Sequence, residues 1–314
     1  MRQASENAGQ GLSLKRGLVI AGPTGSGKTD LAVALARRLD AELISADSRQ
    51  VYRELDAGTA KARPEGVVQH LVDVAAPGER YDVGRFQREA LTALAEIRAR
   101  GRVPILVGGT GLYIKAFLEG LSELPGRDES VRERLQERLE RDGEPALRGR
   151  LAEADPQAAA QIPSGNRQRL IRALEVLELT GKPISEAWSR RRGAATGSWL
   201  ALRIDWPADT LRPRLQARCR AMWPALLEEV RALRARYSGS EPGFESLGYR
   251  EAVAVADGTV GDEAGYEAFE RATLAYAKRQ RTWFRNQLNG EPIDGGSTEA
   301  MAAQALRALA RADA

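Results

Sequence analysis

Cysteine and histidine are almost absent from this sequence of 314 residues, which contains one of each, Cys219 and His70. A single cysteine excludes an internal disulfide and a cysteine-based metal cluster. A single histidine excludes a multi-histidine metal site and the zinc chemistry of nucleic-acid deaminases. Both residues are therefore expected to serve packing or to lie at the surface.

Long apolar runs are also missing. No stretch approaches the roughly 18 apolar residues of a membrane span, and residues 1–15 are polar and unlike a signal peptide. We therefore expect a disordered lead over 1–15 and a cytoplasmic protein with no membrane partner. No heptad pattern or exposed apolar repeat indicates assembly, which favours a monomer.

The sequence has no strong excess of charge of either sign. Lys and Arg number 47 against 43 Asp and Glu, for a net charge of +4. This balance does not by itself indicate a nucleic-acid partner, so the placement of the basic residues has to decide that question.

What the sequence does contain, from Gly17 onward, is an alternation of short apolar strands with helical periodicity. Strands are predicted at 18–21, 41–45 and 103–107, with helices at 30–39 and about 84–100. Such alternation indicates an α/β fold with a parallel, doubly wound sheet. We expect a first part of the core over 16–122, an all-helical insertion over 123–199 without a convincing strand in 128–192, a return to the core over 200–288 that begins with a strand at 200–206, and a tail with a helical end over 289–314.

A glycine-rich turn follows the first strand and opens the first helix. It matches the phosphate-loop pattern G-x-x-x-x-G-K-[ST] at every fixed position. Backbone amides in such a turn converge on a diphosphate, and the helix N-terminus adds the positive end of its dipole. Lys28 supplies a mobile cation, and the Thr29 hydroxyl is placed to bind a Mg²⁺ that bridges phosphate oxygens. The predicted diphosphate-binding residues of this turn are Gly22, Pro23, Thr24, Gly25, Ser26, Gly27, Lys28 and Thr29.

The turn identifies a diphosphate and not a reaction. Most proteins that contain it act on ATP, so a P-loop kinase of a small metabolite or nucleotide is one alternative. Two details argue against a kinase: the strand at 103–107 ends in Gly108-Gly109, with no Asp as a Walker B metal ligand, and no arginine-rich lid is evident. A nucleotide-gated RNA-binding protein without group-transfer chemistry is a second alternative.

Two polar residues follow the second and third predicted strands. Asp47 ends its strand on the side where doubly wound sheets bind ligands, so it should face the phosphate loop. Its carboxylate could hold Mg²⁺ through water or act as a general base, or it could cap the next helix. Thr110 occupies the corresponding end of the next strand, and its flanking glycines would let a ligand approach the backbone closely.

Seven stretches, in order along the chain, resemble the tRNA dimethylallyltransferase family, also called isopentenyl-diphosphate:tRNA transferases. They are GPTGSGKT at 22–29, ELISADSRQVYRELDAGTAK at 42–61, HLVD at 70–73, VPILVGGTGLYIKAFLEGL at 103–121, NRQRLIRALEV at 166–176, SLGYRE at 246–251 and KRQRTWFR at 278–285. The phosphate loop is shared by many proteins, but the combination of ISADSRQVY, GGTGLY and KRQRTWFR is specific. The chain departs from the family pattern by a shorter segment between Lys61 and His70, by Gln69 in place of a proline, and by a missing glycine within 222–230.

This resemblance implies a P-loop fold with a helical insertion, and a Mg²⁺-dependent prenyl transfer. The dimethylallyl group of dimethylallyl diphosphate would move to the N6 amine of the adenosine on the 3′ side of the anticodon, which must first be extruded from its stack. Asp47 resembles the family's general base, and Thr110 the threonine that aligns the acceptor. Lys28 would stabilise charge on the departing diphosphate, and Arg218 aligns with an arginine that contacts the donor.

The resemblance also implies an interface with the tRNA anticodon stem-loop. Basic side chains would hold phosphates, and aromatic rings or guanidinium planes could stack on splayed bases. Without the resemblance, the same arginine clusters would be more typical of solvated helix faces than of a nucleic-acid interface. The implied tRNA-binding residues are Asp47, Ser48, Arg49, Gln50, Thr110, Arg132, Gln168, Arg169, Leu170, Ile171, Arg172, Lys278, Arg279, Gln280, Arg281, Thr282, Trp283, Phe284 and Arg285.

Overall fold

The computed structural model describes residues 16–188 and 190–313, which form two compact units. The first unit is built from the chain up to residue 118 and from residue 195 onward, and the second from residues 119–194. The predicted lead over 1–15 lies outside the described residues. The insertion is thus a compact body of its own.

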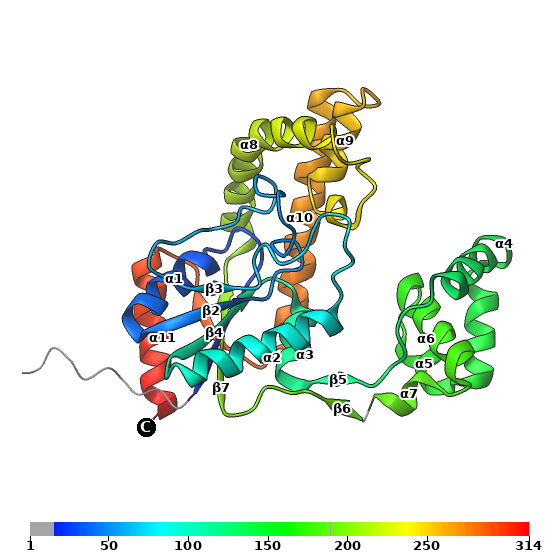
Figure 1. Ribbon diagram of the computed structural model, residues 1–314, viewed down its shortest axis with the longest axis horizontal. Coiled ribbons are helices and arrows are strands. Elements are labelled where there is room, and N and C mark those ends of the chain that lie inside the picture. Colours follow the sequence, from blue (N-terminus) through cyan, green and yellow to red (C-terminus); the bar gives the residue numbers. More distant parts are fainter. Residues whose placement is uncertain (1–15, 189, 314) are drawn as a thin grey trace, which may run out of the picture. The chain divides into compact units, whose positions relative to one another are not determined.

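A parallel sheet forms the centre of the first unit (Figure 1). Its strand order is β3-β2-β4-β1-β7-β8, and all neighbouring strands are parallel. The strands are β1 (Gly17–Ala21), β2 (Ala41–Ser45), β3 (Gln69–His70), β4 (Val103–Gly108), β7 (Trp199–Asp205) and β8 (Glu291–Asp294). Because the strands are parallel, the loops that follow β1, β2 and β4 all leave from the same edge of the sheet, where such folds bind ligands. The predicted α/β core is confirmed.

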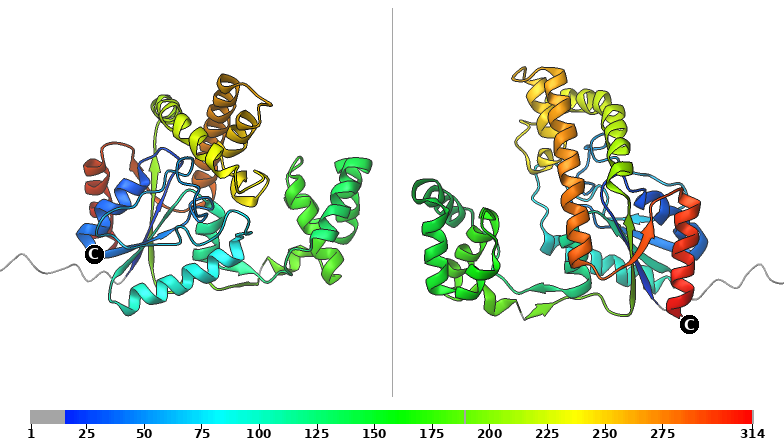
Figure 2. Two further views of the ribbon diagram at one scale, coloured as in Figure 1. Left: turned by 45° about the horizontal axis from the view of Figure 1, so that its top comes forward. Right: turned by 180° about the vertical axis from the view of Figure 1, so that it is seen from behind.

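Helices cover both faces of this sheet. On one face α1 (Lys28–Leu39) packs beside α11 (Thr298–Asp313), whereas α2 (Val83–Ala99) and α3 (Gly111–Glu119) belong to the core on the other face (Figure 2). Successive side chains of a strand point to opposite faces. In β1, Leu18 and Ile20 therefore pack in the core under α1 and α11, and Val19 and Ala21 pack in the core under α2 and α3. Burial on both faces explains why this strand is apolar throughout.

Three further helices complete the first unit, namely α8 (Ala208–Leu233), α9 (Tyr249–Ala256) and α10 (Asp262–Gln287), with a short 3₁₀ turn at Pro242–Glu245. They pack on one another, and α10 runs beside both α8 and α9 (Figures 1 and 2). The Trp223 ring stacks on Phe269 with ring centres 5.8 Å apart. At its C-terminal half α10 reaches the sheet, where Gln280 contacts Gly109 after β4.

The second unit is a small helical body with its own core. It contains α4 (Glu129–Ala154), α5 (Pro156–Gln161), α6 (Arg167–Thr180) and α7 (Ile184–Ala187), and a short antiparallel pair, β5 (Leu121–Ser122) with β6 (Arg191–Arg192). Leu135, Leu151, Leu170 and Leu174 are almost fully buried in its core. The helical path of α4 is interrupted at Gly143, where φ is 80° and ψ is 165°.

The six long elements predicted for the core lie within two residues of their observed bounds. Four short strands among the described residues were missed, β3, β5, β6 and β8. The prediction of no strand over 128–192 is wrong at β6, and the tail over 289–314 contains the edge strand β8 as well as the expected helix. These four strands are two to four residues long, which is too short to display the two-residue alternation from which a strand is predicted.

Candidate active site

A cavity of about 550 Å³ lies in the first unit, beside the loops that follow β1 and β2. Several regions that are distant in the sequence line it. They are the phosphate loop with the start of α1 (24–30), the segment after β2 (47–50), a segment without regular structure (58–62), part of α8 (214–222), a loop (245–247), and part of α10 (269–280). The predicted phosphate loop and the predicted acid thus meet in one cavity.

The phosphate loop has the backbone that its glycines permit. Gly25 and Gly27 adopt left-handed conformations, with φ of 72° and 83°, a region that glycine enters without steric cost. Ser26 is fully buried, and its carbonyl accepts a hydrogen bond of 3.0 Å from the Trp206 ring N–H just after β7. The Thr24 N–H donates to the side chain of Gln280 at 2.8 Å, so this amide is used inside the chain and not for a ligand.

Lys28 is the buried cation of the site. Burial lowers the pKa of its ammonium group to about 8. Asp47 opposes this change and Arg218 adds to it, which places an acid and a second cation in the surroundings of the lysine. A multiply charged anion stabilises the charged form of such an ammonium group, because its negative charge compensates for the water that burial removed. The site therefore favours an anionic ligand. Arg218, on α8, lines the same cavity.

Asp47 lines the cavity directly after β2. Its Oδ1 accepts a hydrogen bond of 2.9 Å from the Arg49 N–H, which fixes the carboxylate within its own turn. The suggestion that Asp47 caps the next helix is wrong, because the residues after it form turns and the next helix is α2, at Val83. A carboxylate held in this orientation at the cavity wall is placed to accept a proton from a bound molecule.

Thr110 is placed against the Asp47 turn rather than in the lining of the cavity. Its Oγ1 accepts from the Ser48 N–H at 3.0 Å and donates to the Ser48 hydroxyl at 3.3 Å. The expectation that flanking glycines admit a ligand is wrong, because the protein fills that space itself. A Cβ at Gly108 would lie 2.1 Å from the Ala46 carbonyl oxygen, and the positions before and after Thr110 face the side chains of Gln280 and Trp283. Thr110 therefore supports the segment that carries Asp47.

The cavity is richer in arginine than the sequence suggested. Arg49, Arg214, Arg218 and Arg279 line it, so arginines gather here although no arginine-rich lid is evident in the sequence. Arg214 was missed, although it lies one helical turn before Arg218 and shares its face of α8. The guanidinium group of Arg214 also lies over the ring of Trp206.

Tyr276 is the other residue that sequence reasoning missed. It lines the cavity from α10, and the guanidinium group of Arg279 lies over its ring, 5.8 Å from the ring centre. Burial raises the pKa of Tyr276 to about 12, and the nearby Asp47 acts in the same direction. The hydroxyl therefore stays protonated at neutral pH and can donate a hydrogen bond. The only signal was its place two residues before the KRQRTWFR stretch.

The predicted tRNA-binding residues of α10 have different exposures. Lys278, Arg279 and Thr282 are exposed, whereas Gln280 and Phe284 are buried and serve the interior. Trp283 is half-buried against Gly111. The Nη2 of Arg285 donates to both oxygens of the Asp205 carboxylate, at 2.9 and 2.8 Å. Arg281 is partly buried, and its Nε has no hydrogen-bond partner among the described residues.

The predicted tRNA-binding residues of the second unit also separate into two groups. Arg132 and Arg172 each form an ion pair of 2.9 Å with Glu175, whose side chain is fully buried. Leu170 and Ile171 are buried in the core of the unit, whereas Gln168 and Arg169 are exposed. Among these predicted residues, Gln168 and Arg169 are therefore the two whose side chains face solvent.

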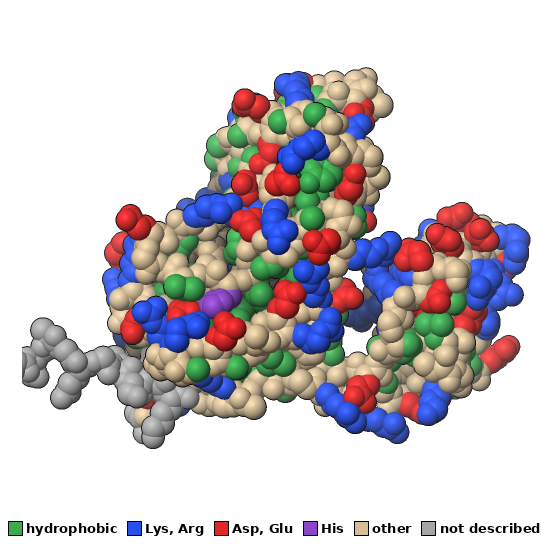
Figure 3. All heavy atoms as spheres, in the orientation of Figure 1, with side chains coloured by type: hydrophobic (Ala, Val, Ile, Leu, Met, Phe, Trp, Pro, Cys, Tyr) green, Lys and Arg blue, Asp and Glu red, His purple; other side chains and the backbone are tan. Residues whose placement is uncertain are grey.

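Charges on the visible surface are mixed. Lys and Arg side chains alternate with Asp and Glu side chains over each unit, and no large field of one sign is visible (Figure 3). On this face, cations are therefore individually placed and do not form one continuous basic patch. Among the described residues, no helix is both long enough and apolar enough to cross a bilayer.

His70, expected to be a packing or surface residue, bonds to Glu42 through a contact of 2.7 Å.

The fold and the cavity together define a P-loop α/β protein in which a carboxylate and a cluster of cations face the phosphate loop. Family models of two descriptions match this chain, "IPP transferase" over residues 50–287 and "Isopentenyl transferase" over residues 16–70. The chain belongs to the IPP transferase family, whose curated members include the tRNA dimethylallyltransferases.

Relatives and solved structures agree with this assignment. A tRNA dimethylallyltransferase of Anaeromyxobacter dehalogenans is 46% identical over 86% of this chain and 92% of its own length. The crystal structure of a full-length tRNA isopentenylpyrophosphate transferase from Bacillus halodurans is similar with a TM-score of 0.67 and 35% identity, over 95% of this chain and 98% of that one. A eukaryotic dimethylallyltransferase acting on tRNA is similar with a TM-score of 0.76 and 27% identity, over 93% and 78% of the two chains. These comparisons favour a transferase over the kinase alternative.

Proposed function

We propose that this protein transfers a dimethylallyl group from dimethylallyl diphosphate to the N6 amine of the adenosine on the 3′ side of the anticodon in tRNA. The carbon–oxygen bond of the donor breaks, a carbon–nitrogen bond forms, the amine proton passes to a base, and diphosphate leaves. The observation that carries this proposal is that Asp47 shares one cavity with the phosphate loop, Lys28 and Arg218. Family membership supplies the class of reaction.

The donor end of the cavity is suited to a leaving diphosphate. Negative charge grows on the bridging oxygen as the carbon–oxygen bond breaks, and fixed donors and cations aimed at that charge lower the barrier. Lys28 and the first turn of α1 supply such groups from the phosphate loop. Arg214 and Arg218 add cations from α8. We therefore assign diphosphate binding to this end.

The acceptor end requires a base, because the adenine amine is a poor nucleophile whose lone pair is delocalised into the ring. Asp47 takes the proton as the carbon–nitrogen bond forms. Its turn is held by the bond from the Arg49 N–H and, through Ser48, by Thr110. Tyr276, with a hydroxyl that stays protonated, lines the same cavity and is a hydrogen-bond donor for the Asp47 carboxylate or for the bound adenine. Thr110 then acts by positioning the base-bearing segment.

The residues present are compatible with Mg²⁺, which we propose as cofactor. The Thr29 hydroxyl and the Asp47 carboxylate are oxygen ligands of the type that Mg²⁺ prefers, and both line the cavity. When bound with the donor, the ion would neutralise charge on the diphosphate. No group of three or more His, Cys, Asp or Glu side chains among the described residues could hold a metal by itself, so most remaining ligands would be diphosphate oxygens and water.

For the tRNA, we propose that exposed cations bind phosphates of its backbone. Lys278 and Arg279 on α10 and Arg169 on α6 are exposed. Phosphate contacts of this kind set register and affinity, whereas the fit of the flipped base in the cavity sets specificity.

The direct test uses dimethylallyl diphosphate labelled in its allyl carbons, unmodified tRNA, Mg²⁺ and the purified protein. We expect label in the tRNA, and mass spectrometry of its nucleosides should find it on one adenosine. ATP in place of the isoprenoid donor should leave the tRNA unchanged. Label that stays in the donor under these conditions would overturn the proposal.

A further inference from the structure

One wall of the cavity is formed by a segment that has no helix or strand to define its shape. Gly58, Thr59, Ala60 and Ala62 line the cavity from this segment. Their side chains are all small. Met222, Leu247 and Phe269 supply larger apolar groups to the same cavity. The space available to an apolar five-carbon chain therefore depends on where the backbone of the 58–62 segment lies.

The backbone around this wall is strained. Glu54 and Ala60 have positive φ values of 67° and 47°. In the neighbouring segment 71–73, Leu71 and Asp73 have values of 63° and 58°. Residues other than glycine avoid this left-handed region. Such conformations persist only where the surroundings impose them, and they concentrate at functional sites. The conformation of the wall therefore has to be held by contacts with side chains outside it.

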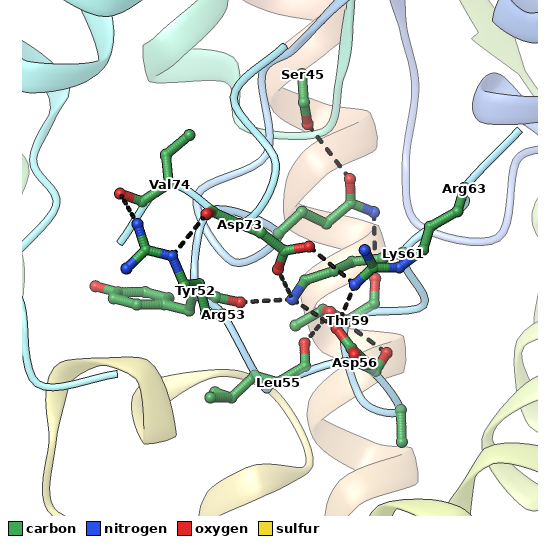
Figure 4. A network of polar contacts seen from close by, with 12 residues as sticks. Ser45, Tyr52, Arg53, Leu55, Asp56, Thr59, Lys61, Arg63, Asp73 and Val74 are labelled. Atoms are coloured by element: carbon green, nitrogen blue, oxygen red, sulfur yellow. Dashed lines mark hydrogen bonds and ion pairs between the residues drawn. The ribbon is translucent and has the colours of Figure 1, made fainter. Parts of the chain in front are cut away.

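Lys61 makes these contacts. Its Nζ donates to the Tyr52 carbonyl at 2.5 Å and forms ion pairs of 2.7 Å with Asp56 and 2.6 Å with Asp73 (Figure 4). An ammonium group has three donors, so all of them are used. The side chain is only 1% exposed. The buried Lys61 side chain thus links the segment 52–56, which precedes the wall, to Asp73 in the neighbouring segment.

A second link joins the wall to the segment that carries Asp47. The side-chain amide of Gln50 donates to the Thr59 carbonyl at 3.2 Å and accepts from the Ser45 hydroxyl at 3.3 Å, at the end of β2. Gln50 was expected to contact tRNA, but both ends of its amide are engaged inside the chain. A displacement of the wall would therefore also reach the acid that takes the proton.

We infer that Lys61 is a positioning residue that fixes the 58–62 wall and thereby makes the cavity select a five-carbon over a ten-carbon prenyl diphosphate. The inference rests on the proposed function, since it concerns the donor of that reaction. Lys61 touches no reacting atom. It acts by holding Asp56 and Asp73 together, which fixes the backbone of the 58–62 wall. A ten-carbon prenyl chain would then clash with this backbone.

The test compares two donors, dimethylallyl diphosphate and geranyl diphosphate, on the same enzyme preparation. The readout is the ratio of the two kcat/KM values, which does not change if part of the protein is merely unfolded. Wild type is expected to prefer the shorter donor. In Lys61→Met, which keeps the length of the side chain and removes its charge, the preference should fall by about tenfold, the scale on which a pocket discriminates small changes in apolar size.

Arg63 gives a matched control, because its guanidinium group pairs with the same two carboxylates, at 3.5 Å from Asp56 and 2.9 Å from Asp73, but is 66% exposed. Arg63→Met should leave the donor ratio unchanged. If Lys61→Met does not fold, Asp73→Asn tests the same link, and its donor ratio should fall in the same direction.

Three outcomes would overturn the inference while leaving the proposed function intact: a wild type that uses both donors equally well, a folded Lys61→Met with the wild-type ratio, or equal loss of preference in Arg63→Met. Failure of wild type to use either donor would instead refute the proposed function.

Discussion

The side chain of Gln280, late in α10, accepts a hydrogen bond of 2.8 Å from the backbone N–H of Thr24 in the phosphate loop. The same amide donates to the Gly109 carbonyl after β4, also at 2.8 Å. One buried side chain thus joins the loops that follow two neighbouring strands to a helix more than 150 residues away in sequence. These loops carry the phosphate-binding turn and the threonine that supports Asp47, so the arrangement of the site depends on this link.

Replacement of Gln280 by Leu should destabilise the protein. The change keeps the shape of the side chain but leaves the buried Gly109 carbonyl and the partly buried Thr24 N–H without their partner, and a group left unpaired away from water costs about 1–3 kcal/mol. We expect the free energy of unfolding in urea to fall by about 2–4 kcal/mol. Thr282→Ala, two residues along the same helix and exposed, should change it by less than about 0.5 kcal/mol. Equal stability of Gln280→Leu and wild type would show that the link is dispensable.

Asp47→Asn should separate chemistry from binding. The amide keeps an oxygen that accepts from the Arg49 N–H but cannot take the amine proton. Turnover should therefore fall by roughly 10²–10⁴-fold, while tRNA affinity, measured by filter binding, stays within a small factor of wild type. Asp40→Asn is the control, because Asp40 is an exposed carboxyl at the far end of α1. Retained turnover in Asp47→Asn would remove Asp47 from the role of base.

Lys28 predicts that diphosphate binding depends on pH. Its pKa in the free protein is about 8, and a bound diphosphate, which favours the charged form, should raise it. Binding should therefore take up protons near pH 8 and weaken as the pH rises further. Calorimetric titration with inorganic pyrophosphate in two buffers of different ionisation enthalpy measures this uptake. Pyrophosphate itself also exchanges protons in this range, so the informative quantity is the difference between the two proteins. Lys28→Arg keeps its charge at these pH values and should take up fewer protons on binding, and identical uptake in both proteins would contradict the assignment.

The same group affects stability in a defined direction. Because the pKa of Lys28 in the folded protein, about 8, lies below its ordinary value of 10.5, the unfolded chain binds more protons between these two values. The contribution of Lys28 to the free energy of unfolding should then rise with pH across this window, and its cost is fully present below pH 8. Urea denaturation of wild type and Lys28→Met at pH 7 and pH 9 tests this sign, since the difference between the two proteins should narrow as the pH rises.

Two arginines on α6 should behave differently although they lie three residues apart. Arg169 is exposed, and its replacement by Ala should weaken tRNA binding and reduce the slope of log K against log salt by about one. Arg172 pairs with the buried Glu175, so Arg172→Ala should instead lower stability, by about 1–3 kcal/mol, because a buried charge loses a partner. Salt titrations of tRNA binding and urea denaturation of both variants make the comparison. The reverse pattern would assign the tRNA contact to Arg172.

Local sequence was sufficient wherever one segment determines its own structure. The phosphate loop, the strands at 41–45 and 103–107 and the helices at 30–39 and about 84–100 were predicted from periodicity and from the turn residues, because hydrophobic alternation and glycine act over a few residues. The meeting of the phosphate loop with Asp47 also followed from sequence, since the carboxyl ends of parallel strands share one edge of the sheet. The basic stretches were found, but not which of their members are exposed.

Sequence by itself therefore determined the α/β core, the phosphate loop and the acid that faces it. Tertiary structure alone decided the rest of the site: that Gln280, Gln50 and Arg172 serve the interior, that Arg214 and Tyr276 enter the cavity, and that Lys61 holds its wall. The physical reason is that each of these roles is a contact between segments distant in the sequence. Whether a polar side chain finds a partner inside the fold or faces a ligand depends on what packs against it, and no local pattern records that.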